Sequence, residues 1–449
     1  MTNENPTQPS TARWRILNPT QPSSVRWRIL GLLMFLSFVS YLLRGNMSIA
    51  APTMMADLQL SEVQWGMIMA AFPLGYALFQ FPGGLLGDRF GPRKVLTWIA
   101  AAWAVLIVLS SMVPGAAVAS AGLIVISLML VQFLVGATHA PVFPVMSATI
   151  ERWFPVGSWA FPNGLSSTGL TLGLAGTASL LPWLMGMVGW RMSFVVLAPV
   201  GLIGAALWWW YAKDNPSEHP AVNSAEVELI NDGRVELEEK KPATSETPAW
   251  LRVLKDRNAL LLTLSYSCMN FVFYVVFSWG FYYLVKIRGF DAQEAGFLTS
   301  AQWMFAGAGA ALGGWYGDFL CQKLGLRWGY RLPIVIGLVI SALLLIGVAV
   351  TPNAYAAAAM LGLCFFFNQT TEGSYWGSSI AIGGRHAGAS GGLLNTGANA
   401  MGFINALLLS LVADTFGWAT AIAIGAGFAL LGAIFALMVR CDEPVNQAD

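Results

Sequence analysis

Residues 83–94 read GGLLGDRFGPRK, and a related stretch, GGWYGD, occupies residues 313–318. The two copies begin about half a chain length apart in a sequence of 449 residues. Each copy closes a long apolar run and opens a short basic stretch. A glycine-acid turn that is repeated in this way predicts a duplicated membrane protein whose charged turns lie on one face, and it points to transport.

The composition is that of a membrane protein. Hydrophobic residues make up 56% of the chain and charged residues 10%, whereas soluble domains carry about 25% charged residues. Apolar stretches of roughly 20 residues, each long enough to cross a bilayer as a helix, recur along nearly the whole length. We predict an all-α membrane protein with twelve transmembrane helices, at residues 28–52, 64–87, 95–113, 121–149, 162–187, 190–212, 258–284, 294–318, 331–351, 354–380, 388–413 and 417–440.

One long hydrophilic segment, at 214–257, divides six predicted spans from six. Its Glu, Lys, Pro and Ser residues are typical of a cytoplasmic linker. Together with the repeated turn, it predicts two six-helix bundles, at 28–213 and 258–440. A tail at 1–27 precedes them, and a second tail follows at 441–449.

The distribution of positive charge predicts the orientation. Of the 24 Lys and Arg residues, only Arg191, Lys286 and Arg288 fall in loops that we place outside, and Arg44 lies within a span. The positive-inside rule therefore puts both termini in the cytoplasm. The first apolar run is long and lacks a small-residue cleavage site, so no cleavable signal peptide is indicated.

The N-terminal tail contains a tandem repeat. Residues 5–17 read NPTQPSTARWRIL and residues 18–30 read NPTQPSSVRWRIL. One interpretation is a doubled basic segment that lies on the anionic inner leaflet. The alternative is a short genetic duplication whose first copy is dispensable, and we favour it.

The first glycine-acid turn has the chemistry of a conformational latch. Gly84 lets two helix ends approach closely, and the Asp88 carboxylate can accept hydrogen bonds at the N-terminus of a neighbouring helix. Arg89 and Arg93 remain in water and anchor the loop. The alternative is a tight turn that carries only topological charges, but the full spacing and the second copy favour the latch.

This turn resembles the loop signature G-x-x-x-D-R-x-G-x-[RK] of the major facilitator superfamily. Its positions are filled by Gly84, Asp88, Arg89, Gly91 and Arg93. The second copy keeps the glycine and Asp318, but Phe319 replaces the arginine. We therefore expect a weaker latch in the second half.

Other stretches resemble the anion:cation symporter family, which includes bacterial sugar-acid permeases. They are YLLRGNMS at 41–48, the segment from Phe143 to Pro155, NPSEHP at 215–220 and GGLLNTGAN at 391–399. The resemblance covers essentially the whole chain. It implies two bundles that rock around a central cavity and carry a small organic anion.

Arg44 is the most informative residue within the predicted spans. A charge at that depth costs at least about 2.5–3.5 kcal/mol on insertion scales, so it should face a wet cavity or a partner. Its guanidinium fork matches a carboxylate. The alternative is a structural ion pair with an acid such as Glu372. The resembling family uses an arginine here for its organic anions, which favours a substrate site.

The sequence allows more than one residue to couple proton movement to substrate transport. For Glu372 there are three interpretations: a proton carrier, a counter-charge to Arg44, or a hydrogen-bonded structural acid. Gln132 and His139 are seven residues apart and share a helix face. The sugar-acid permeases usually have arginine and glutamate there, and an acid where this chain has Leu43. These acids are thought to couple proton and substrate in that family, so their absence places the usual mechanism in doubt.

His139 is a candidate replacement, because imidazole exchanges protons near neutral pH; the alternative is a hydrogen-bonding core residue. The missing second arginine favours a less negatively charged substrate, such as a monocarboxylate.

Further candidates for the substrate site are Tyr41, Ser48, Tyr274, Asn395 and Asn399. The two asparagines lie at i and i+4, so their amides could read hydroxyl groups together. Each one alone is more often an interhelical hydrogen bond.

These features predict a monomeric secondary active transporter in the bacterial inner membrane. It would import a sugar acid or a related carboxylate by proton symport. The rival functions are an exporter of drugs or metabolites on the same fold and a non-transporting solute sensor. No catalytic constellation is visible, and the four cysteines lack metal-ligand spacing. We therefore expect no enzyme activity, no cofactor or metal, and no nucleic-acid partner.

Overall fold

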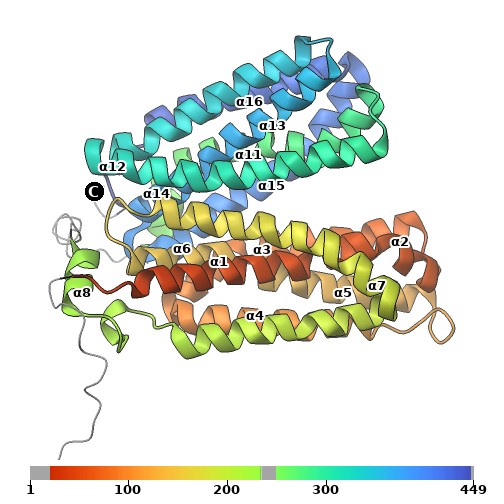
Figure 1. Cartoon of the computed structure of the whole chain (residues 1–449), viewed down its shortest axis with the longest axis horizontal. Coiled ribbons are helices and arrows are strands. Elements are labelled where there is room, and N and C mark those ends of the chain that lie inside the picture. The colour runs from red at the N-terminus through yellow and green to blue at the C-terminus, as the bar shows by residue number, and fades with distance from the viewer. Residues whose placement is uncertain (1–20, 233, 235–248, 446–449) are drawn as a thin grey trace, which may run out of the picture.

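The computed structural model describes residues 21–232, 234 and 249–445, and the regular elements in these ranges are helices (Figure 1). The first bundle contains α1 (Val25–Arg44), α2 (Asn46–Leu58), α3 (Glu62–Phe90), α4 (Pro92–Ser111), α5 (Ala121–His139), α6 (Val142–Trp153) and α7 (Ala160–Tyr211). The linker contributes the short helices η2 (Pro216–Glu218), α8 (Ser224–Asn231) and α10 (Ala249–Lys255). The second bundle contains α11 (Arg257–Tyr282), the π-helix η3 (Tyr283–Ile287), α12 (Ala292–Val350), α13 (Ala354–Thr370), α14 (Glu372–Gly383), η4 (Gly384–His386), α15 (Ala387–Phe416) and α16 (Trp418–Met438).

Eight helical stretches in the described ranges are long and apolar enough to cross a membrane. Two of them turn back on themselves at a glycine with positive φ: α7 at Gly189 (φ 74°) and α12 at Gly325 (φ 75°). Each of these two therefore supplies two crossings. The pair α13–α14 and helix α15 complete the twelve crossings that the hydropathy pattern predicts.

The two bundles lie side by side, with α3 against α15 and α7 against α12. In Figure 1 the first bundle runs from red to yellow-green and the second from teal to blue. Helix α8 and the C-terminal end lie at the same end of both bundles, which we name the linker end. The other end is named the opposite end.

Helix starts and crossings follow from local sequence. Ser61 and Gln64 form a reciprocal capping box that begins α3. Within the first bundle, α3 and α5 cross at Gly75 and Gly136, where an added Cβ would lie 2.1 Å from a backbone carbonyl oxygen of the other helix. Small residues at such a crossing let backbones approach closely. This crossing positions the α3 and α5 side chains of the candidate site.

The first part of the linker is built onto the start of α1. The buried Glu226 carboxylate of α8 accepts hydrogen bonds from the backbone N–H groups of Val25 and Arg26, both at 3.2 Å. It also pairs with the Arg26 guanidinium at 3.2 Å. Glu226 thus satisfies donors at the N-terminus of α1. Arg26 belongs to the second copy of the tandem repeat, whereas the first copy, at 5–17, lies outside the described residues.

Replacing Gly91 with alanine is expected to destabilise the first bundle. Gly91 ends α3 with φ 86°, and an added Cβ would lie 2.6 Å from the carboxylate of Asp214. Strain of this kind costs about 1–3 kcal/mol, and each kcal/mol lowers Tm by about 2–4 °C in a domain of this size. Thermal unfolding of the purified protein in detergent measures the effect. Gly122→Ala is the control, because an added Cβ there meets open space.

Candidate functional site

Each of the three ionisable residues that the sequence places at mid-span lies at a break in a membrane helix. Arg44 is the last residue of α1, and α2 begins at Asn46. His139 is the last residue of α5, and Glu372 is the first residue of α14, after α13 has ended. Broken helices at membrane depth are tolerated where they line a cavity or are buried in protein, and transporters build binding sites from them.

Arg44 lies among aromatic rings of α1 and α3. Its guanidinium donates a hydrogen bond to the Tyr41 hydroxyl at 3.1 Å. Its carbon Cζ lies 4.4 Å from the centre of the Phe72 ring, 5.0 Å from that of Tyr41 and 5.2 Å from that of Tyr76. Ring faces attract a cation at such distances. These contacts hold the arginine in place at the break between α1 and α2.

Glu372 does not form the ion pair with Arg44 that the sequence allowed. Its Oε1 accepts hydrogen bonds from the Tyr266 hydroxyl and the Trp376 indole N–H, both at 2.9 Å. Among the residues described, no carboxylate oxygen lies within 4.0 Å of the Arg44 guanidinium nitrogens. No acid of the described residues therefore pairs with Arg44, whereas the Glu372 carboxylate has its own donors.

Aromatic side chains of both bundles connect Arg44 with Glu372. The ring centres of Tyr41 and Phe143 lie 6.2 Å apart, and those of Phe143 and Trp376 lie 6.0 Å apart. Trp376 then donates to Glu372. The two charged side chains therefore face each other across a layer of rings, one charge on each bundle.

The other predicted substrate residues differ in whether they contact Arg44 or its neighbours. Asn395 of α15 donates a long hydrogen bond, 3.5 Å, to the Tyr76 hydroxyl, and Asn399 donates to the Asn395 carbonyl at 2.8 Å. Tyr274 of α11 interacts electrostatically with Arg44. Ser48 is exposed on α2, and among the described residues no hydrogen bond links it to Arg44.

Gln132 and His139 line one small cavity together with Arg44, as the shared helix face predicts. The cavity has a volume of about 20 Å³, and its remaining lining residues are Leu43, Asn46, Met47, Trp103, Ile107, Ser110, Val135 and Phe194. A volume of this size suits a single water molecule and is too small for an organic anion. Gln132 therefore borders a side cavity behind Arg44.

Sequence reasoning missed Phe72, Tyr76, Trp103 and Tyr266. All four are aromatic residues in apolar spans, where such residues are common. Of these four residues, only Tyr76 has a sequence feature that could have indicated it: it lies four residues after Phe72, so both side chains face the same side of α3. Two of the three helix breaks could not be located either, because the Arg44–Gly45 and Thr371–Glu372 junctions contain no proline, whereas Pro141 follows the break after His139.

The two repeated aspartates make equivalent contacts between the bundles. Asp88 of α3 accepts from the backbone N–H groups of Gly388 and Ala389, at 3.1 and 3.0 Å, in the first turn of α15. Asp318 of α12 accepts from Ala160 and Phe161, at 2.8 and 2.9 Å, in the first turn of α7. Each carboxylate thus caps a helix of the other bundle at its positive end.

The basic residues of the first turn do not take part in this cross-bundle contact. Arg89 is exposed, with its guanidinium 5.4 Å from the Phe90 ring centre. Arg93 donates from its side chain to the Trp209 carbonyl at 2.7 Å, which lies within the same bundle. The missing arginine next to Asp318 therefore removes no hydrogen bond of the latch. The Asp318 contact has the same two-bond geometry as the Asp88 contact, and the weaker latch expected from Phe319 stays a prediction.

Gly84 makes the close approach that the sequence predicts. A Cβ added there would lie 2.1 Å from the carbonyl oxygen of Gly388 in the other bundle. Gly314 has the corresponding place in the second turn, where an added Cβ would lie 2.5 Å from the Ala160 carbonyl oxygen. The backbones of the two bundles are therefore in contact at both latches.

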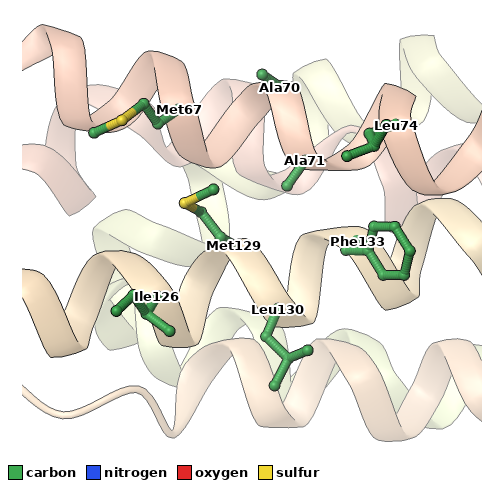
Figure 2. Close-up of a pocket in the computed structure, with 8 residues that line it drawn as sticks. All are labelled: Met67, Ala70, Ala71, Leu74, Ile126, Met129, Leu130 and Phe133. Atoms are coloured by element: carbon green, nitrogen blue, oxygen red, sulfur yellow. The ribbon is translucent and has the colours of Figure 1, made fainter.

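A larger cavity, of about 370 Å³, lies between α3 and α5 on the outside of the first bundle (Figure 2). Its eight lining residues are all apolar: Met67, Ala70, Ala71, Leu74, Ile126, Met129, Leu130 and Phe133. Leu74 is 56% exposed and Ile126 is 66% exposed. The groove therefore suits hydrocarbon chains of the bilayer and offers no partner to an anion.

Comparison with known proteins decides the family. The sequence model of the Major Facilitator Superfamily matches residues 33–406, which include both glycine-acid turns and most of both bundles. The chain belongs to the major facilitator superfamily. Members of this family move solutes across membranes, and the chain is accordingly a multi-pass membrane protein.

Curated relatives within the superfamily are transporters of organic acids. A probable sulfoacetate transporter of Cupriavidus necator is 30% identical over 389 residues, which cover 86% of this chain and 87% of that protein. A hexuronate transporter of Bacillus subtilis is 27% identical and covers 91% of this chain and 92% of its own length. A probable galactarate/D-glucarate transporter of Escherichia coli K12 is 30% identical and covers 73% of this chain and 74% of its own length.

Solved structures of the superfamily share the fold. A proton:xylose symporter superposes with a TM-score of 0.75 at 14% identity, covering 94% of this chain and 98% of that structure. The fucose:proton symporter of Escherichia coli gives a TM-score of 0.69 at 18% identity, covering 93% and 99%. At this identity, the likeness establishes the twelve-helix architecture alone.

Proposed function

We propose that this chain is a secondary active transporter that imports a small organic anion, a sugar acid or a related carboxylate. The observation that carries the proposal is Arg44, a guanidinium at a helix break that is held by aromatic rings and balanced by no described acid. A partly buried guanidinium in that state is a favourable site for an anion from outside the chain. The relatives that transport hexuronate, galactarate and sulfoacetate support this substrate class.

The site suits a substrate with one anionic group. Arg44 would bind the carboxylate through its fork. The Tyr76 and Tyr274 hydroxyls and the amides of Asn395 and Asn399 would face hydroxyl groups of a polyol chain. A monoanion is favoured over a dianion, because the described residues place no cationic side chain other than Arg44 beside the ring layer, and a second carboxylate would have no cationic partner there.

The latches support alternating access as the transport mechanism. The positive-inside distribution of charge supports an orientation with the linker end in the cytoplasm. Asp88 and Asp318 join the bundles at that end, which supports assigning this structure to a state closed toward the cytoplasm. Opening the latches and closing the opposite end would then present Arg44 to the other side. The inward direction and the coupling to a proton belong to this proposal, and the uptake experiment below tests both.

Uptake into proteoliposomes tests the function. The purified chain would be screened with D-glucuronate, D-galactonate, D-glucarate and sulfoacetate, with and without an inward pH gradient. Import of at least one acid, accelerated by the gradient, is expected. A sensor would bind an acid without flux, and an exporter of neutral or cationic compounds would move none of these acids. Either result would overturn the proposal.

Two substitutions of Tyr76 distinguish its hydroxyl contact from its ring–cation contact with Arg44. Tyr76→Phe keeps the ring beside Arg44 and removes the hydroxyl that meets Asn395, so we expect a loss of affinity of about two- to tenfold. Tyr76→Ala also removes the ring–cation contact, worth about 0.5–2 kcal/mol, and should weaken binding further. The anion Kd, measured by isothermal titration, distinguishes the two variants. Equal losses in both would show that the ring has no role.

A further inference from the structure

We propose that His139 is the proton-binding residue of this carrier and that its proton is linked to the substrate anion through Arg44. The inference rests on the proposed function, because it needs an anion bound at Arg44. It assigns the coupling role that the sequence leaves open between His139 and Glu372, and it requires no carboxylate in the coupling step.

Both ring nitrogens of His139 face backbone carbonyl oxygens. Nδ1 lies 2.8 Å from the Val135 oxygen, and Nε2 lies 3.1 Å from the Ser40 oxygen. A carbonyl can only accept a hydrogen bond, whereas a neutral imidazole has a single N–H to donate. The neutral ring therefore leaves one nitrogen lone pair against an oxygen. The imidazolium donates to both carbonyls, so the backbone around His139 is arranged for the protonated ring.

The ring surroundings of His139 also suit a cation. The Trp103 ring of α4 stacks on it at a centroid distance of 4.7 Å and an interplanar angle of 25°. Phe72 of α3 lies 6.0 Å away. The face of a tryptophan ring is the strongest aromatic partner for a cation. His139 itself is 3% exposed, so bulk water contributes little to stabilising its charge.

One charged side chain opposes protonation. Arg44 of α1 lines the same cavity and acts electrostatically on His139. The other elements around the cavity contribute neutral side chains: Trp103, Ile107 and Ser110 from α4, Gln132 and Val135 from α5, and Phe194 from α7. No acid of the described chain lines this cavity. When His139 is protonated, two cations share a small space, and their repulsion falls when an anion binds to Arg44.

This arrangement makes the proton and the anion bind cooperatively. An anion on Arg44 lowers the positive potential at His139 and so favours its protonation. By reciprocity, the protonated histidine raises the affinity for the anion by the same factor. The step is a simple protonation: a proton from water bonds to the ring lone pair, and no other bond forms or breaks. A carrier that loads both ligands together performs symport.

The Ser40 contact adds a mechanical link. Ser40 lies one helical turn before Arg44, in the last turn of α1. A protonated His139 donates to its carbonyl oxygen and so ties the break after α5 to the turn that carries Arg44. Loss of the proton turns this attraction into a contact between a lone pair and a carbonyl. His139 is therefore also a positioning residue for Arg44.

Histidine NMR tests the linkage directly in the wild-type chain. The sequence contains only three histidines, His139, His219 and His386, so ¹⁵N-histidine labelling yields few signals. The signal lost in His139→Gln assigns the residue. We expect saturating D-glucuronate or D-galactonate to move the His139 titration midpoint to higher pH, equivalent to an increase of about 5- to 150-fold in proton affinity. In folded Arg44→Gln, the midpoint should be higher without the anion and insensitive to it.

Binding and transport give a second readout. In the wild type, anion affinity should be highest at low pH and should fall as pH rises from the anion-free to the anion-bound midpoint. His139→Gln should still bind the anion but lose this pH dependence and the ability of a pH gradient to accumulate the anion. Glu372→Gln is the matched control: the amide can still accept from Tyr266 and Trp376, so the pH dependence should remain.

The outcomes separate this inference from the proposed function. If the wild type binds and imports an anion while the His139 titration ignores it, the linkage is wrong and the transport function stands. The same holds if His139→Gln still accumulates the anion under a pH gradient, or if Glu372→Gln alone loses the pH dependence. If none of the acids binds the wild type, the proposed function fails, and the inference fails with it.

Discussion

Arg44→Ala is expected to abolish uptake of the anion and to weaken its binding by at least about thirtyfold. Truncating one partner of a buried, hydrogen-bonded charge pair costs about 2–5 kcal/mol, and each 1.4 kcal/mol is a factor of ten in Kd. The loss should be large because no other described cation borders the ring layer that connects Arg44 with Glu372. Isothermal titration with the best substrate of the uptake screen, followed by proteoliposome uptake, measures both effects.

Two matched variants make this result specific. Arg44→Lys keeps the charge but lacks the planar fork, so binding should be recovered only in part. Arg28→Gln removes an exposed arginine from the same helix, where it contacts the Tyr211 hydroxyl at 3.4 Å. That control should retain wild-type affinity and uptake. Undiminished transport by Arg44→Ala would instead indicate a carrier of neutral or cationic compounds and would exclude the anion site.

The sequence predicts the architecture well because the information is local and repeated. A run of about 20 apolar residues forms a membrane helix whatever its neighbours are. The turns at Gly84–Asp88 and Gly314–Asp318 also predict the close approach of two helix ends, since glycine permits close packing and an acid can accept hydrogen bonds at a helix N-terminus. The number of crossings, the duplication and the family follow from these features.

The sequence predicts only those residues of the candidate site whose placement within the membrane costs free energy. Arg44, His139 and Glu372 stand out because polar groups are rare at that depth. Their partners do not stand out: Phe72 and Trp103 are ordinary residues of an apolar span. The absence of a pair between Arg44 and Glu372 depends on a distance between two bundles, which no local pattern contains. Arg89 is exposed, as a residue that remains in water should be, and its role in anchoring the loop stays a prediction.

Removing both latches is expected to invert the conformational preference of the carrier. In Asp88→Ala/Asp318→Ala, four backbone N–H groups at the starts of α7 and α15 lose their carboxylate acceptors. Hydrogen bonds to a charged group contribute about 1.5–3 kcal/mol each. If each latch contributed the free energy of only one such hydrogen bond, its loss at both latches would shift the equilibrium between the two states by about a hundredfold or more. Because the bonds join the bundles at the linker end, the state closed at that end loses this stabilisation.

Spin-label distances across the opposite end report this shift. Val118 follows α4 and is 80% exposed, and Val350 ends the second arm of α12 and is 74% exposed. The four native cysteines are buried, so labels on Val118→Cys and Val350→Cys would dominate the signal. We expect the distance between them to shorten in the double variant, because opening the linker end closes the opposite end.

The single variants and a control decide whether the two latches are equivalent. Asp88→Ala and Asp318→Ala should each produce an intermediate shift of similar size, because both carboxylates make two bonds to the first turn of a helix in the other bundle. Asp232→Ala, which changes an exposed aspartate at the end of α8, should leave the distance unchanged. A shift in Asp88→Ala alone would mean that the Asp318 contact contributes nothing to the preference. That result would favour an asymmetric gate, in which the arginine-bearing turn alone holds the linker end closed and the second turn serves only helix packing.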